Sequence, residues 1–293
     1  IEHDLSGYDD KISDIKIQTD GKIVATGYTS NQGVKEYATV RYNTDGTLDN
    51  SFGTNGIVTT SLLNPQVDNY AWDMAIDSLG NIVVAGNAHN GNNNDWALIR
   101  YTSSGVLDGS FGSSGVVITA IGWSGEYATC IKIQPDGKII TGGASYKTTG
   151  DEFALDRFNF DGSLDNTFGT NGIVLTNVAA SSIQDIDLLD NGKIIAAGST
   201  DIGGFDTDYA LALYNSDGTL DTTFGTGGIV VHPIGVGSDI IYSVIAAPNG
   251  KIIAAGNGTD GNWYNAIVTQ YHLSDSIICI NPSPVSKWNF DGV

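Results

Sequence analysis

The sequence has few basic residues, few cysteines and no long apolar segment. Its 13 Lys and Arg stand against 33 Asp and Glu, which gives a formal net charge of -20. A surface of that sign opposes nucleic acid and anionic membrane, and leaves cations, neutral sugars and basic proteins as partners. No window approaches the ~18 apolar residues of a membrane-spanning helix, so we expect no membrane insertion. Two cysteines, Cys130 and Cys279, are too few for a disulfide framework, and one bridge and two thiols are both open.

The composition favours a folded chain with many tight turns. Of the 293 residues 41% are hydrophobic, which is enough to build a core, and 38 are glycine. The chain begins at Ile1 without a methionine or a signal peptide. We therefore expect a processed or excised piece of a larger chain.

One unit recurs along the chain with a period near 57 residues. Aligned on a hairpin glycine, the five copies fall at Gly21, Gly80, Gly137, Gly192 and Gly250. Repeats of this length are typical of propellers and solenoids, so the strands inside one unit decide between them.

Each unit contains four predicted strands. An alternating strand such as DIKIQ and a turn such as TDGK lead into an apolar strand such as KIVATG, and strands such as YATVRYN and GIVTT follow. Four antiparallel strands with two apolar faces describe a propeller blade between two neighbours. The sequence predicts an all-β, five-bladed β-propeller over residues 1–273, with a tail or linker at 274–293. The repeats are about 13–72, 73–128, 129–183, 184–242 and 243–273 plus strand 1–5.

The fifth unit has no obvious fourth strand in register. The segment IEHDLSG, from Ile1, falls where VITAIGW and VVHPIGV fall in other units. We expect residues 1–5 to supply the missing strand and to close the ring, which removes two exposed sheet edges. The alternative is a longer array in which SIICI, residues 276–280, is the outer strand of the fifth blade.

A longer signature links the third and fourth strands. The unit DGKI(I/V)xxG, RYN, DGxLDxxFG and GIV resembles the delta-60 repeat family of bacterial propellers, over nearly the whole chain. The resemblance implies a propeller in a secreted or cell-surface setting. That family has no assigned activity, so it implies no catalytic residue here.

The LDxxFG signature itself admits two interpretations. Its Asp and Gly residues suit a turn, and its Phe suits a plug between blades. Alternating oxygen ligands also suggest a Ca²⁺ loop, formed by Asn43, Asp45, Thr47 and Asp49. The glycine falls at position four rather than six, and Thr54 stands where a bidentate Glu is required, so the structural interpretation is favoured.

Ligand binding is expected where the repeats differ, in the loops after the second strands and between blades. These loops contain Asn, Asp, Gly and aromatic residues that suit stacking on a sugar and hydrogen bonds to its hydroxyls. The candidate ligand-binding residues are Trp72, Tyr127, Trp123, Trp263 and Tyr264. Caps on the blades are the structural alternative for these side chains.

Carboxylates recur at the start of the innermost strands. Asp14, Asp73 and Asp185 share this position with Cys130 and Ser243. Three carboxylates around one channel mouth could hold a cation, or act as acid and as nucleophile or base on a glycosidic bond. They could instead hydrogen-bond the turn of the adjacent blade, and this interpretation is favoured.

Together these patterns predict a binding or display module of a larger extracellular or cell-surface protein. It would recognise a surface glycan or protein through its loop face, without nucleic acid and without catalysis. One alternative is a glycosidase or lyase that uses Asp14, Asp73 and Asp185, and another is a structural spacer.

Overall fold

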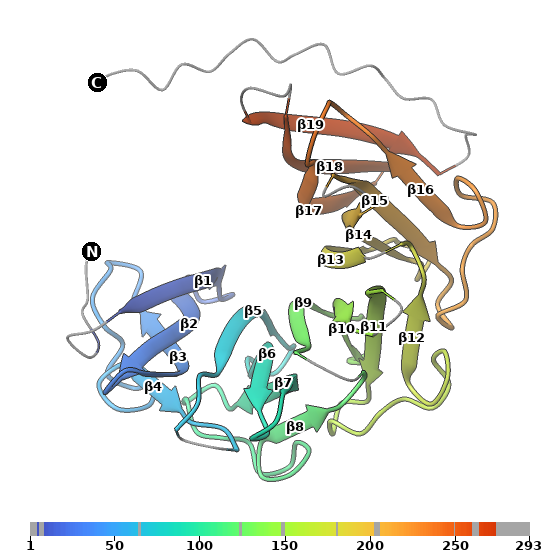
Figure 1. The fold of residues 1–293 in the computed structure, drawn as a ribbon. Helices are drawn as coiled ribbons and strands as arrows, with labels where there is room; N and C mark the ends of the chain where they lie inside the picture. Colours follow the sequence, from blue (N-terminus) through green and yellow to red (C-terminus); the bar gives the residue numbers. More distant parts are fainter. Residues whose placement is uncertain are drawn as a thin grey trace, which may run out of the picture. The chain divides into compact units, whose positions relative to one another are not determined.

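The fold is entirely β-structure in the part of the chain that the computed structural model describes. Those residues are 5, 9–63, 66–122, 125–147, 150–179, 181–201, 206–248, 250–259 and 264–273. They form 19 strands in five antiparallel sheets (Figure 1). Within them no helix is long and apolar enough to cross a membrane. The chain divides into two compact units, residues 1–175 and 176–293, each described by itself.

The first unit holds three sheets, each a meander of four strands in chain order. The first contains β1 (Asp10–Ile17), β2 (Ile23–Asn31), β3 (Val34–Tyr42) and β4 (Ile57–Thr60). The second contains β5 (Tyr70–Ile76), β6 (Ile82–His89), β7 (Asn94–Tyr101) and β8 (Val116–Thr119). The third contains β9 (Tyr127–Ile133), β10 (Ile139–Ser145), β11 (Glu152–Phe158) and β12 (Ile173–Thr176), whose last residue begins the second unit.

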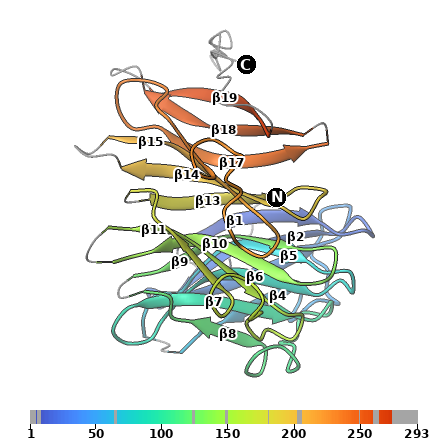
Figure 2. The same ribbon diagram turned by 90° about the vertical axis from the view of Figure 1, so that its right-hand side faces the viewer.

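The second unit holds two sheets that lie face to face (Figure 2). One contains β13 (Ser181–Leu188), β14 (Ile194–Asp201), β15 (Thr207–Tyr214) and β16 (Ile229–His232). The other has three strands, β17 (Ile240–Ala247), β18 (Lys251–Thr259) and β19 (Tyr264–His272). The predicted blades are therefore present as sheets of four, four, four, four and three strands.

Neighbouring sheets of one unit pack through apolar faces, because each middle strand buries side chains on both sides. In β6, Val84 packs toward the first sheet and Val83 toward the third, and both are fully buried. In the second unit, Tyr209 of β15 is buried in one cluster with Val244 and Ile252 of the last sheet. This two-sided burial explains the nearly continuous apolar pattern of the second strands.

The first strand of every sheet, which we call its innermost strand, carries a β-bulge at the same point of the repeat. These strands are β1, β5, β9, β13 and β17. The residue left out of the pairing is Ser13, Trp72, Thr129, Gln184 or Tyr242. The bulge brings a backbone carbonyl against the glycine of the second strand. A Cβ on Gly86 would lie 1.9 Å from the carbonyl oxygen of Tyr70, and the same holds at Gly27. This contact explains why the second strand has a glycine there in every repeat.

The LDxxFG signature ties together the turn end of each four-stranded sheet. Asp49 Oδ2 accepts hydrogen bonds from Arg41 Nε at 2.7 Å and Lys22 Nζ at 2.9 Å. Its Oδ1 accepts from the backbone N and the hydroxyl of Ser51. The Arg41 guanidinium lies 4.6 Å from the ring centroid of Phe52, which is fully buried. Donors within the chain thus occupy both carboxylate oxygens, as a structural turn requires.

Several predicted features lie outside the described residues. They include the candidate ring-closing residues 1–4, the tail 274–293 with Cys279, and the candidate ligands Trp123 and Trp263. Cys130 is buried in β9.

Candidate functional site

Five half-buried aromatic side chains form a continuous row in the first unit. We call this set the aromatic row; it consists of Tyr28, Tyr70, Trp72, Tyr127 and Tyr146. The residues come from β2, β5, β9 and the loop after β10, and therefore from all three sheets. In a meander, second strands end and innermost strands begin at the same end of the sheet, opposite the hairpin and LDxxFG turns. The row therefore lies at the loop end, where ligand contacts were expected.

The rings contact one another in sequence along the row. Tyr28 meets Tyr70 edge-to-face, with centroids 5.2 Å apart, and Tyr70 stacks on Trp72 at 5.7 Å. Trp72 meets Tyr127 at 6.4 Å, and Tyr127 meets Tyr146 at 6.3 Å, both edge-to-face. These separations are those of attractive aromatic pairs, so the rings hold one another in place.

Hydrogen bonds fix the polar atoms of the row. Trp72 Nε1 donates to Asn87 Oδ1 at 3.2 Å, and Asn94 Nδ2 donates to the Tyr127 hydroxyl at 3.0 Å. The Tyr70 hydroxyl donates to Asp68 Oδ2 at 2.9 Å. Amide and carboxylate groups therefore lie directly beside the aromatic surface.

Two lysines lie over the rings. Lys11 Nζ is 5.6 Å from the centroid of Trp72, and Lys35 Nζ is 5.1 Å from Tyr28 and 5.0 Å from Tyr70. Lys35 Nζ also donates to the Tyr70 hydroxyl at 3.3 Å, and this hydrogen bond raises the pKa of the lysine. Burial raises the pKa of Tyr70, with Lys35 opposing the shift. The Tyr70 phenol is thus neutral beside a positively charged Lys35.

The backbone of the repeat positions the row. Tyr70 and Tyr127 begin their innermost strands at equivalent positions, and their carbonyl oxygens face Gly86 and Gly143 at the bulges. Trp72 is the bulged residue of β5, so its ring leaves the regular pairing of the strand and reaches its neighbours in the row.

The structure brings together only some of the residues that the sequence proposed. Trp72 and Tyr127 lie in the row, whereas Tyr264 is 69% exposed at the start of β19 and enters no ring contact in the described part of the chain. Trp123 and Trp263 lie outside the described residues. Tyr28, Tyr70 and Tyr146 were not among the candidate residues, although they fall in segments where ligand contacts were expected. Their signal was position: Tyr28 and Tyr146 follow the second-strand glycine by one and three residues, and Tyr70 begins β5.

The repeated carboxylates hold backbone groups of the next sheet. Asp14 Oδ2 accepts a hydrogen bond from Met74 N at 3.3 Å, and Asp73 Oδ2 accepts one from Ile131 N at 2.9 Å. Lys16 Nζ lies 2.8 Å from Asp14 Oδ2 and 3.5 Å from Asp73 Oδ1. Burial raises the pKa of Asp73, and the neighbouring Asp14 adds to the shift, while Lys16 opposes it.

Asp185 makes the same contact in the second unit. Its Oδ2 accepts from Val244 N at 2.9 Å and from the Ser243 hydroxyl at 3.0 Å. Each of the three candidate carboxylates therefore joins its sheet to the next. The described residues contain no group of three or more His, Cys, Asp or Glu placed to hold a metal ion.

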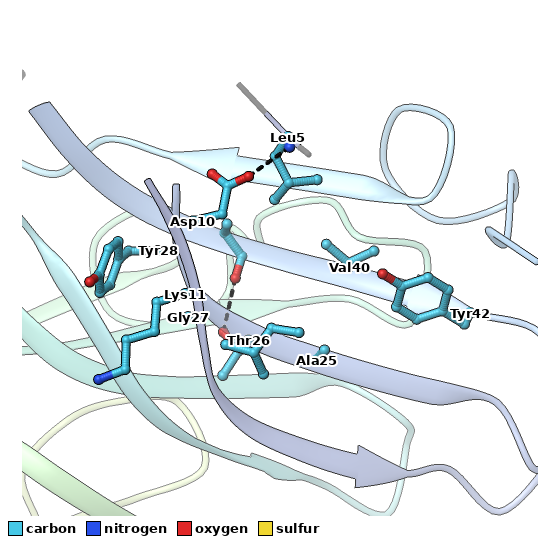
Figure 3. A pocket seen from close by; sticks show the side chains of 11 residues that line it. Leu5, Asp10, Lys11, Ala25, Thr26, Gly27, Tyr28, Val40 and Tyr42 are labelled. Atoms are coloured by element: carbon cyan, nitrogen blue, oxygen red, sulfur yellow. Dashed lines mark hydrogen bonds between the residues drawn. The ribbon is translucent and has the colours of Figure 1, made fainter. Parts of the chain in front are cut away.

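A cavity of about 300 Å³ lies on the first sheet beside one end of the row. Lys11 and Tyr28 line it together with apolar residues such as Ala25 and Val40 (Figure 3). In the second sheet, Ile99 takes the position that Val40 has in the first sheet, and Ile99 packs against the first sheet. The cavity therefore lies over an apolar blade face of the first unit rather than in a polar ligand pocket.

Comparison with known families supports the repeat. Four segments match the model described as "Domain of unknown function (DUF5122) beta-propeller", at residues 18–52, 80–111, 134–168 and 189–224. Each match begins near a hairpin turn and ends at the Phe of the LDxxFG signature. The chain is therefore built from β-propeller repeats. No curated protein gives a significant match.

Several solved structures are similar to this chain at low sequence identity. Drosophila Semaphorin 2a is 9% identical with a TM-score of 0.53, and the match covers 89% of this chain and 48% of that one. An endo-arabinase from Bacteroides thetaiotaomicron is 15% identical with a TM-score of 0.46, covering 89% and 94%. An ulvan lyase is 11% identical with a TM-score of 0.48, covering 90% and 68%. The chain spans about half the length of the semaphorin, and at 9% identity this likeness is one of fold alone.

Proposed function

We propose that this chain of β-propeller repeats is a non-catalytic glycan-binding module, and that the aromatic row is its binding surface. The observation that carries the proposal is the continuity of the row, in which five half-buried rings from three sheets contact one another. Sugars present C–H faces that pack on aromatic rings and hydroxyls that need fixed polar partners. Asn94 and Asp68, both partly exposed, supply such partners beside the rings, whereas Asn87 is fully buried and holds Trp72 Nε1.

A glycan array with matched variants tests this proposal. Trp72→Ala should abolish binding of the glycans that the native chain retains, while Trp72→Phe should retain part of it because a ring remains. Phe160→Ala is the control, since Phe160 is 42% exposed in the turn after β11, at the opposite end of the sheet. Thermal unfolding of each variant verifies folding. If the native chain binds no glycan but binds a protein, and Trp72→Ala abolishes that binding, the row is a protein-binding surface instead.

The proposal includes a closed five-bladed ring completed by the N-terminal strand. The last sheet has three strands, and its face exposes Ile245 and Val268, at 56% and 55%. The first sheet exposes Ile15 and Ile17, at 55% and 73%. A fourth strand from residues 1–5 beside β19 would let these faces be covered, because each sheet would then have neighbours on both sides.

A repeated contact makes the closure specific. The outer strand of one sheet caps a Tyr hydroxyl of the next, as in Thr60 Oγ1 to Tyr101 at 2.7 Å and His232 Nδ1 to Tyr271 at 3.0 Å. By the repeat, His3 corresponds to His232 and would pair with Ala266 as His232 pairs with Tyr209. In the double variant His3→Cys/Ala266→Cys, a disulfide that forms within one molecule supports closure. A disulfide-linked dimer as the sole product contradicts it.

The proposed location is outside the cell or on its surface, as the resemblance to delta-60 repeats implies. Proteinase treatment of intact cells should degrade the protein, and full protection would exclude this location.

A second candidate function is hydrolysis or elimination at Asp14 and Asp73. It is favoured by the pKa of Asp73, which burial raises toward the range of a general acid, next to a second carboxylate. Against it, both carboxylates already accept backbone hydrogen bonds from the next sheet. Sugar release that stops in Asp73→Asn would establish catalysis, and no release from a broad polysaccharide panel would exclude it.

A further inference from the structure

Two ammonium groups at the aromatic row differ from most bases of this chain. Lys11 and Lys35 enter none of the ion pairs formed among the described residues, and both lie over rings of the row. Elsewhere lysines pair with carboxylates at short distance, as Lys22 does with Asp49 at 2.9 Å and Lys138 does with Asp165 at 2.8 Å.

The carboxylates near these lysines accept hydrogen bonds from neutral donors and keep their charge, but neither forms an ion pair with Lys11 or Lys35 among the described residues. Asp68 accepts hydrogen bonds from the backbone N of Lys35 and from the Tyr70 hydroxyl, each at 2.9 Å. Asp10 accepts one from the Thr29 hydroxyl at 2.6 Å. The ring faces hold the ammonium groups at fixed positions without neutralising them, because a cation over a ring keeps its full charge.

We infer that the ligand of the aromatic row is an acidic saccharide, whose carboxylate or sulfate groups contact Lys11 and Lys35 while its sugar rings pack on the aromatic side chains. The inference rests on the proposed glycan-binding function and names its ligand class. Charge-assisted hydrogen bonds from lysine to carboxylate or sulfate are stronger than those between neutral groups, so they would select acidic over neutral sugars.

The net charge of -20 disfavours anionic ligands over the surface as a whole, so an acidic saccharide must be attracted by the lysines at the row itself. Charges farther away than about 8 Å are largely screened at 0.15 M ionic strength, so the groups at the row itself decide the interaction. The distant negative charge acts mainly at low salt, where it slows the approach of a polyanion.

Calorimetric titration of the full chain with charge-matched sugar pairs tests the inference. The probes are oligogalacturonate against its methyl ester and sulfated dextran oligomers against dextran oligomers, at 0.15 M NaCl. The variants are Lys11→Gln and Lys35→Gln. The control is Lys251→Gln in β18 of the second unit, which changes the net charge equally but lies outside the row. The two pairs separate a carboxylate ligand from a sulfate ligand.

The expected result is preferential binding of at least one acidic probe. Loss of either row lysine should weaken that binding by at least about tenfold, the equivalent of one charge-assisted hydrogen bond. Neutral probes should be unaffected, and Lys251→Gln should match the native chain. Equal loss for acidic and neutral probes would mean that the lysines only support the rings, and equal loss in all three variants would mean a net-charge effect; either outcome overturns the inference.

Failure of the inference and failure of the proposed function give different results. Trp72-dependent binding of neutral glycans alone overturns the acidic ligand and keeps the glycan-binding surface. Absence of any Trp72-dependent glycan binding overturns both.

Discussion

Replacing the buried carboxyl of Asp156 by an apolar side chain should stabilise the protein. Asp156 lies in β11 opposite Thr141, is fully buried, and has no hydrogen-bond partner for either oxygen among the described residues. Burial raises the pKa of Asp156 well above its usual range, and the nearby Glu126 adds to the shift. The same position of the first two sheets holds Val40 and Ile99.

The magnitude follows from two terms. Burying a Val side chain contributes about 1.5–3 kcal/mol, and relieving a buried polar group without a partner contributes about 1–3 kcal/mol. Because the cross-strand neighbour Thr141 stays polar and part of the first term is lost, we expect Asp156→Val to gain about 2–4 kcal/mol. At roughly 2–3 °C per kcal/mol for a chain of this size, the Tm should rise by roughly 5–10 °C.

The gain should depend on pH in a defined direction. The folded state binds the Asp156 proton more tightly than the unfolded state, so native stability falls as pH rises above the unfolded pKa of about 4. Urea unfolding at pH 4.5 and pH 8 should therefore show a larger advantage of Asp156→Val at pH 8. Asp156→Asn is the control, since it cannot ionise and should remove the pH-dependent part alone. A native chain more stable than Asp156→Val at both pH values would refute the reasoning, because it would mean that the carboxyl has favourable partners.

Two further substitutions test the repeat. Gly86→Ala should lower the free energy of unfolding by at least about 3 kcal/mol, because its Cβ would lie 1.9 Å from the Tyr70 carbonyl oxygen. Gly109→Ala should leave that free energy nearly unchanged, because nothing lies within 4 Å of its Cβ. Equal unfolding midpoints of the two variants in urea would contradict this. Asp165→Asn should lower the free energy of unfolding by about 3–5 kcal/mol, because it removes the carboxylate that pairs with the buried Arg157 at 2.7 Å. Although burial opposes the shift, Lys138, Thr167 and Arg157 hold the pKa of Asp165 well below its usual range. This stabilisation is therefore present above about pH 4 and is lost as the pH falls further. A free energy of unfolding that does not change below about pH 4 would count against it.

The repeat made most of the fold predictable from sequence. The hairpin glycines and the LDxxFG signature set a register in which each strand could be placed, and predicted strands such as GIVTT appear as β4, Ile57–Thr60. The bulges were not predictable, because they depend on where a carbonyl of one strand meets its neighbour. The glycine that accommodates them, such as Gly86, was visible as a repeated letter but its cause was not.

The site was only partly predictable, because ring contacts join residues far apart in the chain. Trp72 stood out as a departure from the repeat and Tyr127 was also a candidate, whereas Tyr70, at the position equivalent to Tyr127, was not singled out. Tyr28 and Tyr146 end or follow second strands of different sheets, and only the packing of the sheets brings them into one row.

The bulge gives a physical reason why function can vary on a fixed blade. The glycine and the carbonyl that it accommodates are required by the backbone and recur in every sheet. The bulged residue has no partner in the register of its two strands, and its identity differs in every repeat, for example Ser13, Trp72 and Tyr242. A change there alters the loop end without disturbing the hydrogen bonds of the strand. The position that supports the aromatic row is thus also one at which a repeat can change its loop-end surface without changing its fold.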